Sequence, residues 1–166
     1  FTGSSGSITS AVCPTALVFS PQSKEELKST IDVYLKQSPK GDFSDGPHGP
    51  VGEWDVSRIT DMRGMFSGER RFNGDISKWD VSRVTNMERM FYGAERFKGD
   101  ISKWDVSSAT DMSGMFWDAK EFNGDISKWD VSSVSNVKGM FRNAKAFDGD
   151  LSKWDVSSAT DMTGMF

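Results

Sequence analysis

The sequence predicts an α/β fold: a solenoid of 25-residue strand–helix coils whose N-terminal end is closed by a capping helix. Two observations lead to this prediction. Tryptophan recurs at a fixed interval of 25 residues, and every tryptophan opens a near copy of one motif, in which a period-two stretch precedes a stretch with helical spacing. Repeats of about 20 to 50 residues are typical of proteins whose units stack on one another. The recurring tryptophans are Trp54, Trp79, Trp104, Trp129 and Trp154.

Length and repeat positions divide the chain into three parts. Residues 1–22, rich in Ser, Thr and Gly at their start, read as a linker or extended N-terminal segment. Residues 23–53 read as a capping helix and a loop, and 54–166 as a solenoid of four full repeats and one partial repeat. Because the chain starts without Met and stops inside a repeat, we expect it to be a piece of a longer protein, and the lack of a signal peptide is uninformative.

The capping helix is predicted over Lys24–Gln37. Ser23 precedes Glu26 by three residues, which is the capping-box spacing. The Ser38–Pro39 pair then ends the helix, because the residue before proline disfavours helical geometry. The apolar residues at helical spacing that would cover the first coil are Leu27, Ile31, Tyr34 and Leu35.

Each coil divides into a predicted strand and a predicted helix, as the copy that begins at Trp79 shows. Over 76–82, Trp79 and Val81 alternate with polar residues, which indicates a short strand with one buried face. Over 85–97, apolar residues fall at i, i+3, i+4 and i+7, which indicates a short helix with an apolar stripe. The residues of that stripe are Met87, Met90, Phe91 and Ala94. We expect stacked coils to bury the tryptophan, methionine and phenylalanine columns, with a partner for each indole N–H.

One repeat, FNGDISKWDVSSVxNVxxMFxxAxxF from Phe122 onward, resembles the BspA-type leucine-rich-repeat surface proteins. The resemblance covers 54–166, four complete copies and one partial copy without insertions. It implies a leucine-rich-repeat-like solenoid and an extracellular or cell-surface location, and it implies no catalytic residues. Glu69 departs from the pattern, since the same slot holds alanine in later coils. We therefore expect a splayed first coil, or a Glu69 side chain that reaches the capping helix.

Two polar columns on the outward face of the predicted strands are candidate binding residues. One interpretation is a ribbon that binds a glycan, a basic peptide or a calcium ion shared between coils, and the other is a solvated sheet face. The residues proposed for binding are Asp80, Asp105, Asp130, Ser82, Ser107 and Ser132. A further acidic column follows the turn glycines, and we favour a turn-forming role for it over a calcium site. That column is Asp75, Asp100, Asp125 and Asp150.

Tyr92 and Trp117 are the other candidates, because they occupy one slot in successive coils and break the repeat. Exposed aromatic pairs often anchor a protein partner or a sugar ring, although the two rings could instead pack over the junction of their coils.

The function classes follow from composition and from missing motifs. A net charge of −4 and a pI of about 5.0 argue against nucleic acid as a partner, and no apolar run is long enough for a membrane span. Cys13 and His48 are single residues of their types, and no phosphate-binding or dinucleotide motif is present. We therefore predict a non-enzymatic module, without cofactor or metal, that recognises or adheres to a protein or glycan at a cell surface. The alternatives are a structural spacer that projects another domain and a calcium-stabilised surface repeat.

Overall fold

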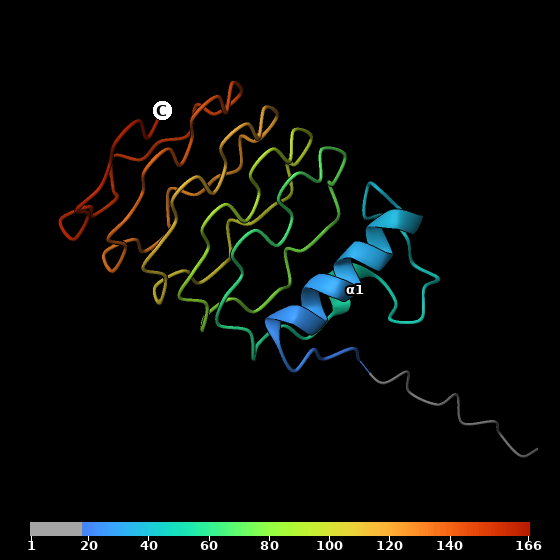
Figure 1. Cartoon of the computed structure of the whole chain (residues 1–166). Coiled ribbons are helices and arrows are strands. Elements are labelled where there is room, and N and C mark those ends of the chain that lie inside the picture. The colour runs from blue at the N-terminus through green and yellow to red at the C-terminus, as the bar shows by residue number, and fades with distance from the viewer. Residues whose placement is uncertain (1–17) are drawn as a thin grey trace, which may run out of the picture.

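One α-helix covers the first of a series of stacked coils in the computed structural model, which describes residues 18–166 (Figure 1). The helix α1 (Lys24–Gln37) lies across the N-terminal end of the stack, and a short 3₁₀ helix, η1 (Val51–Glu53), leads into the first coil. Successive coils then lie side by side up to the C-terminal end of the chain (Figure 1). Of the predicted segment 1–22, residues 1–17 lie outside the described residues, and so does Cys13.

Helix α1 has the bounds and the N-cap that its sequence predicts. The Ser23 hydroxyl accepts a hydrogen bond from the Glu26 backbone N–H at 3.2 Å, and the Glu26 carboxylate accepts one from the Gln22 backbone N–H at 2.7 Å. These bonds satisfy donors that a helix N-terminus leaves free. In the first turn of α1, Lys24 Nζ lies 2.8 Å from Asp61 Oδ2 of the first coil. The apolar face of α1, which packs on that coil, consists of Leu27, Ile31, Tyr34 and Leu35.

The predicted α/β architecture of strand–helix coils is wrong. Within residues 18–166 the only helices are α1 and η1, and the coils contain isolated parallel bridges instead of strands. The predicted strand over 76–82 is a pair of turns, in which Ile76 O accepts from Trp79 N at 3.1 Å and Val81 O accepts from Val84 N at 2.9 Å. Period-two alternation reports which side chains face inward, and consecutive turns satisfy it as well as an extended strand does. The bridges join Asp61 to Asn86, Asn86 to Asp111, Asp111 to Asn136 and Asn136 to Asp161.

The predicted helix over 85–97 is replaced by a segment that hydrogen-bonds to the neighbouring coils. The N–H groups of Met87, Arg89 and Phe91 donate to carbonyls of the next coil at 2.8–2.9 Å. The carbonyls of the residues just before them accept from the previous coil, so alternate peptide groups all point the same way along the stack. This alignment needs left-handed backbone at intervals, and Arg89 (φ 53°) and Asp118 (φ 58°) supply it along with several glycines.

Helical spacing of apolar residues in this segment arises from turns. Met90 N donates to Met87 O at 3.1 Å and Ala94 N donates to Phe91 O at 3.0 Å, so each turn closes over three residues. Two such turns in succession bring positions i, i+3, i+4 and i+7 to one side, the pattern that an amphipathic helix also produces. The spacing therefore identified the buried side chains correctly, while the backbone path differs.

Columns of aromatic side chains form the core. In the central coils, the tryptophan Nε1–H donates to the carbonyl of the residue 28 positions earlier, as from Trp104 to Ile76 O at 3.2 Å and from Trp129 to Ile101 O at 3.1 Å. The rings of Phe66, Phe91, Phe116 and Phe141 stack with successive centroids 5.5–5.7 Å apart. Within residues 18–166 no buried side-chain nitrogen or oxygen lacks a hydrogen-bond partner. The repeat interval thus sets a register in which every coil covers the one before it.

Candidate functional site

The predicted aspartate and serine columns lie on the surface as a row of hydrogen-bonded turns. Asp105 Oδ1 accepts hydrogen bonds from the Ser107 backbone N–H at 3.1 Å and from the Ser107 hydroxyl at 2.6 Å. A carboxylate that bonds the backbone two residues later stabilises a turn. The same pair of bonds joins the other predicted residues, Asp80 to Ser82 and Asp130 to Ser132. The residues are therefore aligned, as the sequence predicts, but on turns and not on the outward face of a strand.

These hydrogen bonds lower the pKa of the Asp105 and Asp130 carboxylates. The pKa of Asp105 lies below its ordinary value, chiefly because the Ser107 hydroxyl and backbone N–H donate to the carboxylate. The neighbouring charge of Asp130 acts in the opposite direction on Asp105 and is the weaker influence. Within the described part of the chain, no group of three or more His, Cys, Asp or Glu side chains is placed to hold a metal ion.

The second acidic column also forms turns. Asp100 Oδ1 accepts from the Ser102 backbone N–H at 3.0 Å, and the equivalent bond recurs in the coils on either side. This is the turn role that we favour from the sequence. Each of these carboxylates thus stabilises the turn in which it lies.

Tyr92 and Trp117 meet on the surface, and two arginines stack on them. The ring centroids of Tyr92 and Trp117 lie 5.7 Å apart with an interplanar angle of 55°. The guanidinium carbon of Arg142 lies 4.7 Å from the Trp117 ring centroid, and that of Arg89 lies 5.9 Å from the Tyr92 ring centroid. Both distances are within the range of a cation–π interaction. We call these four residues, drawn from three successive coils, the aromatic–arginine cluster.

A glycine on the next coil seats the Trp117 indole. A Cβ atom at Gly139 would lie 3.1 Å from Trp117 Cε3, so a larger residue there would push the ring back by a few tenths of an ångström. Gly139 also has a left-handed φ of 61°, which glycine adopts without strain. Trp117 and Tyr92 are both half-buried. The pair is therefore packed over the junction of its coils on one side and open to solvent on the other.

The arginines of the cluster keep most of their hydrogen-bonding capacity. Arg142 makes no ion pair within the described residues, and the Arg89 Nε lies 3.8 Å from Glu88, whose carboxylate is closer to Arg63 at 3.1 Å. Stacking on an aromatic ring holds a guanidinium in place and leaves its in-plane N–H groups free. Such groups match carboxylates, sulfates and phosphates. Other cations of this flank are paired between coils: Arg70 with Glu95, Lys120 with Glu95, and Lys98 with Glu121.

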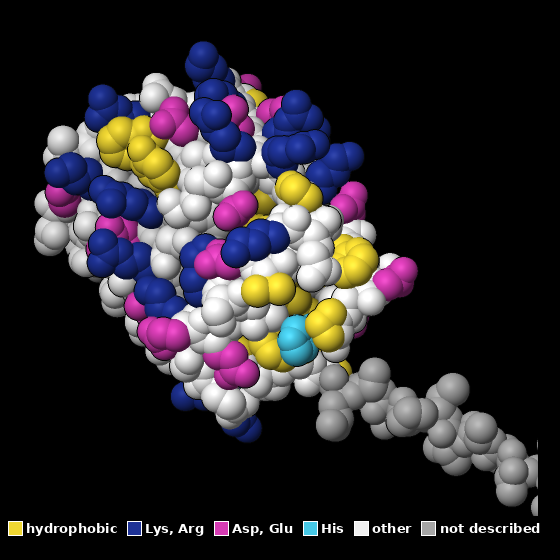
Figure 2. All heavy atoms as spheres, turned by 45° about the vertical axis from the view of Figure 1, so that its right-hand side comes forward, with side chains coloured by type: hydrophobic (Ala, Val, Ile, Leu, Met, Phe, Trp, Pro, Cys, Tyr) yellow, Lys and Arg dark blue, Asp and Glu magenta, His cyan; other side chains and the backbone are white. Residues whose placement is uncertain are grey.

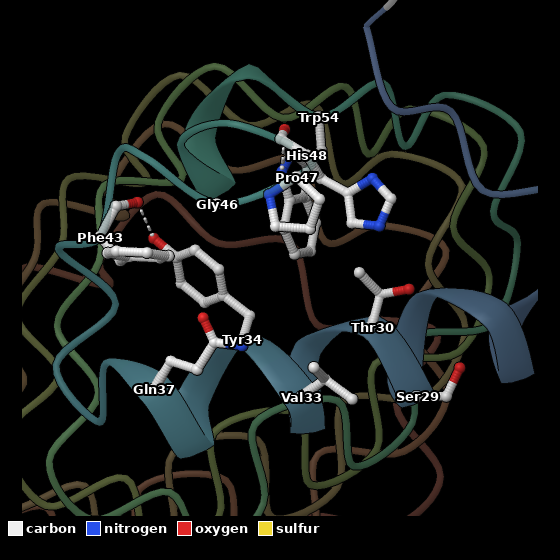
Figure 3. Close-up of a pocket in the computed structure, with 10 residues that line it drawn as sticks. All are labelled: Ser29, Thr30, Val33, Tyr34, Gln37, Phe43, Gly46, Pro47, His48 and Trp54. Atoms are coloured by element: carbon white, nitrogen blue, oxygen red, sulfur yellow. Dashed lines mark hydrogen bonds between the residues drawn. The ribbon is translucent and has the colours of Figure 1, made fainter.

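A pocket that the sequence does not predict lies between α1 and the loop 41–50 (Figure 3). Its cavity volume is about 200 Å³, and four aromatic side chains line it together with residues of α1 such as Val33. Val33 is 55% exposed at the rim of this pocket. Figure 2 shows hydrophobic side chains gathered around the histidine at this end of the molecule. The four aromatic side chains, which we call the cap cage, are Tyr34, Phe43, His48 and Trp54.

Hydrogen bonds fix the walls of the cap cage at steep angles to one another. The planes of Tyr34 and Trp54 meet at 76°, and those of His48 and Trp54 at 86°. The Tyr34 hydroxyl donates to Phe43 O at 2.7 Å, and Trp54 Nε1 donates to His48 O at 3.0 Å, so both buried rings hold the loop. Burial raises the pKa of Tyr34, which keeps the hydroxyl protonated as a donor. Aromatic residues in a loop rich in Gly and Pro are the one signal in the sequence that could have indicated this pocket.

The sequence matches one protein family, described as "Mycoplasma protein of unknown function, DUF285", over residues 42–147 and again over 98–166. The two matches together span more than half of the chain and take in the stacked coils. No curated protein and no solved structure matches the chain. In the described part of the chain, α1 is too short and too polar to cross a bilayer, and no other helix could do so.

Proposed function

The chain belongs to the DUF285 family of proteins of unknown function, and we propose that it is a non-enzymatic recognition module that binds an acidic partner at a cell surface. The resemblance to BspA-type surface proteins supports the surface location. The partner would be an acidic glycan, or an acidic segment of a protein.

The aromatic–arginine cluster is the observation on which this proposal rests. It places two half-exposed rings between two guanidinium groups that no strong ion pair neutralises. Ring faces and edges offer apolar contact at little cost in conformational entropy, and stacked guanidinium groups select carboxylates or sulfates. A structural spacer has no need for such a cluster at a slot that elsewhere holds Ser67.

The repeated aspartate–serine turns support a non-enzymatic role. The aspartates that line the surface recur in every coil with the same serine partners, so no single constellation stands out as a positioned acid–base pair. We therefore assign these columns to the rigidity of the surface.

Binding to arrays of glycans and to extracellular protein fractions tests the proposal. We expect Trp117→Ser to abolish binding while the fold persists, because serine is already accepted at this slot in the first coil. Arg142→Gln should weaken binding and reduce its dependence on salt, since one screened charge contact is lost. Lys103→Gln is the matched control, because it also removes one positive charge but lies beside the Asp105–Ser107 turn, outside the aromatic–arginine cluster. It should leave binding unchanged. Equal binding by all three variants would contradict the proposal.

A further inference from the structure

The geometry points to the cap cage as a binding site for a trimethylammonium group, independent of the recognition surface proposed above. The cage lies at the N-terminal end of the stack, formed by α1 and the loop 41–50, whereas the aromatic–arginine cluster lies on the coils. Three features of the cage favour such a group: its walls, its charge and its size.

The walls have the arrangement that holds a cation with no hydrogen-bond donors. Tyr34 and Trp54 form a corner with ring centroids 5.4 Å apart, and Phe43 and His48 extend it on either side at centroid distances of 6.2 Å from Tyr34 and 6.4 Å from Trp54. A quaternary ammonium group is attracted by the faces of several rings at once, which is the physical basis of aromatic cages. Figure 3 shows these rings on one side of the space, with Thr30 and Val33 of α1 opposite.

The charge around the cage favours a cation over an anion. No Lys or Arg side chain lines the pocket. The segment 18–54 that forms it carries more acidic than basic residues, and three of the acidic residues lie in or beside the loop. Those three are Asp42, Asp45 and Glu53, of which Glu53 is paired with Lys78. A cation that enters the pocket therefore meets aromatic rings and no Lys or Arg side chain in the walls.

The size of the cage suits a compact group. A cavity of about 200 Å³ is smaller than the pockets of about 300–1,000 Å³ that hold drug-sized ligands, but it exceeds cavities of about 150 Å³ that take up benzene. A trimethylammonium group fits such a space, and the open rim beside Val33 lets the rest of its molecule remain in solvent.

The decisive experiment compares choline with 3,3-dimethylbutanol, its neutral isostere, by NMR titration of the intact chain at constant ionic strength. We expect choline to shift the Trp54 indole N–H signal and to bind at least about fivefold more tightly than the isostere. Equal or tighter binding of the isostere would show that the pocket is merely apolar and would overturn the assignment.

Two kinds of variant separate cation recognition from folding. Phe43→Leu keeps the apolar volume and removes a ring, so choline affinity should fall about fivefold while the affinity for the isostere is retained. Val33 is exposed at the rim, so Val33→Glu and Val33→Lys should both fold and should shift choline affinity in opposite directions, each by about threefold. The same choline affinity in the glutamate and lysine variants would contradict the proposal.

Two further probes identify how the group is presented. Trimethyl-lysine amide represents a modified protein, and phosphocholine represents a choline-bearing lipid or polymer. The probe that binds more tightly identifies the source, and failure of both to bind would overturn the inference. Trp117→Ser should leave all of these affinities unchanged, so the cap cage can fail or succeed separately from the proposed recognition surface.

Discussion

Replacing Gly139 by alanine gives a quantitative test of how the Trp117 indole is seated. Gly139 and Gly64 occupy the same slot in different coils, with left-handed φ values of 61° and 65°. Alanine at either position has to adopt a conformation that costs about 1–2 kcal/mol. At Gly64 the new Cβ would meet only Ser67 Cβ at 3.8 Å, whereas at Gly139 it would lie 3.1 Å and 3.3 Å from two atoms of Trp117. Overpacking of this kind adds about 1 kcal/mol.

We therefore expect Gly64→Ala to lower the free energy of unfolding by about 1–2 kcal/mol, and Gly139→Ala by about 2–3 kcal/mol. Urea denaturation, followed by circular dichroism with comparison of m-values, measures both. In the background of Trp117→Ser, the two alanine substitutions should lower the free energy of unfolding by the same amount. The contact with the indole is then gone, and only the backbone strain remains. Equal costs in the wild-type background would refute the seating of the indole on Gly139.

Three further predictions concern the cap, the core and the turns. Ser23→Ala should lower the free energy of unfolding by about 1 kcal/mol, measured by urea denaturation, because the N-cap bond is lost. Trp129→Phe should cost about 2 kcal/mol in the same assay, since the indole bond to Ile101 O and part of a buried ring disappear together. The folded-state pKa of Asp105 is lowered, so its bonds to Ser107 stabilise the protein above the unfolded pKa of about 3.9 and are lost as pH falls through the folded pKa. Ser107→Ala should therefore reduce the difference between the urea midpoints at about pH 6 and about pH 3, and an undiminished difference would contradict this origin of the acid sensitivity.

The features that could be predicted from the sequence depend either on a few neighbouring residues or on the repeat interval. Ser23 and Glu26 specify the start of α1 locally, and the apolar spacing of the helix needs no knowledge of the coils. The interval of 25 residues places equivalent side chains in columns, which is why the burial of Trp104 and Phe116 was predictable. The proximity of Tyr92 and Trp117 follows from the same rule.

The backbone path of the coils could not be predicted, because hydrophobic spacing reports burial and not dihedral angles. Turns that close over three residues give the spacing of a helix, and left-handed residues such as Arg89 have no clear signature in the sequence. The stacking of Arg142 on Trp117 and the cap cage were missed for another reason. Both depend on the direction in which a side chain or a loop extends from the repeated backbone. The periodicity of the sequence contains no information on these directions.

A small excess of backbone N–H groups that point toward higher residue numbers gives the stack a weak electrical polarity. In the coil that begins at Trp79, four backbone N–H groups, such as those of Met87 and Phe91, donate toward higher residue numbers, while three, such as that of Thr85, donate toward α1. Peptide dipoles that line up in this way add together, as they do in a helix. The end under α1 therefore has a slightly negative backbone potential, which adds to the favourable contact between Lys24 Nζ and Asp61. The backbone potential therefore differs in sign between the two ends of the stack. A positively charged group is favoured next to the end under α1, and a negatively charged group next to the other end.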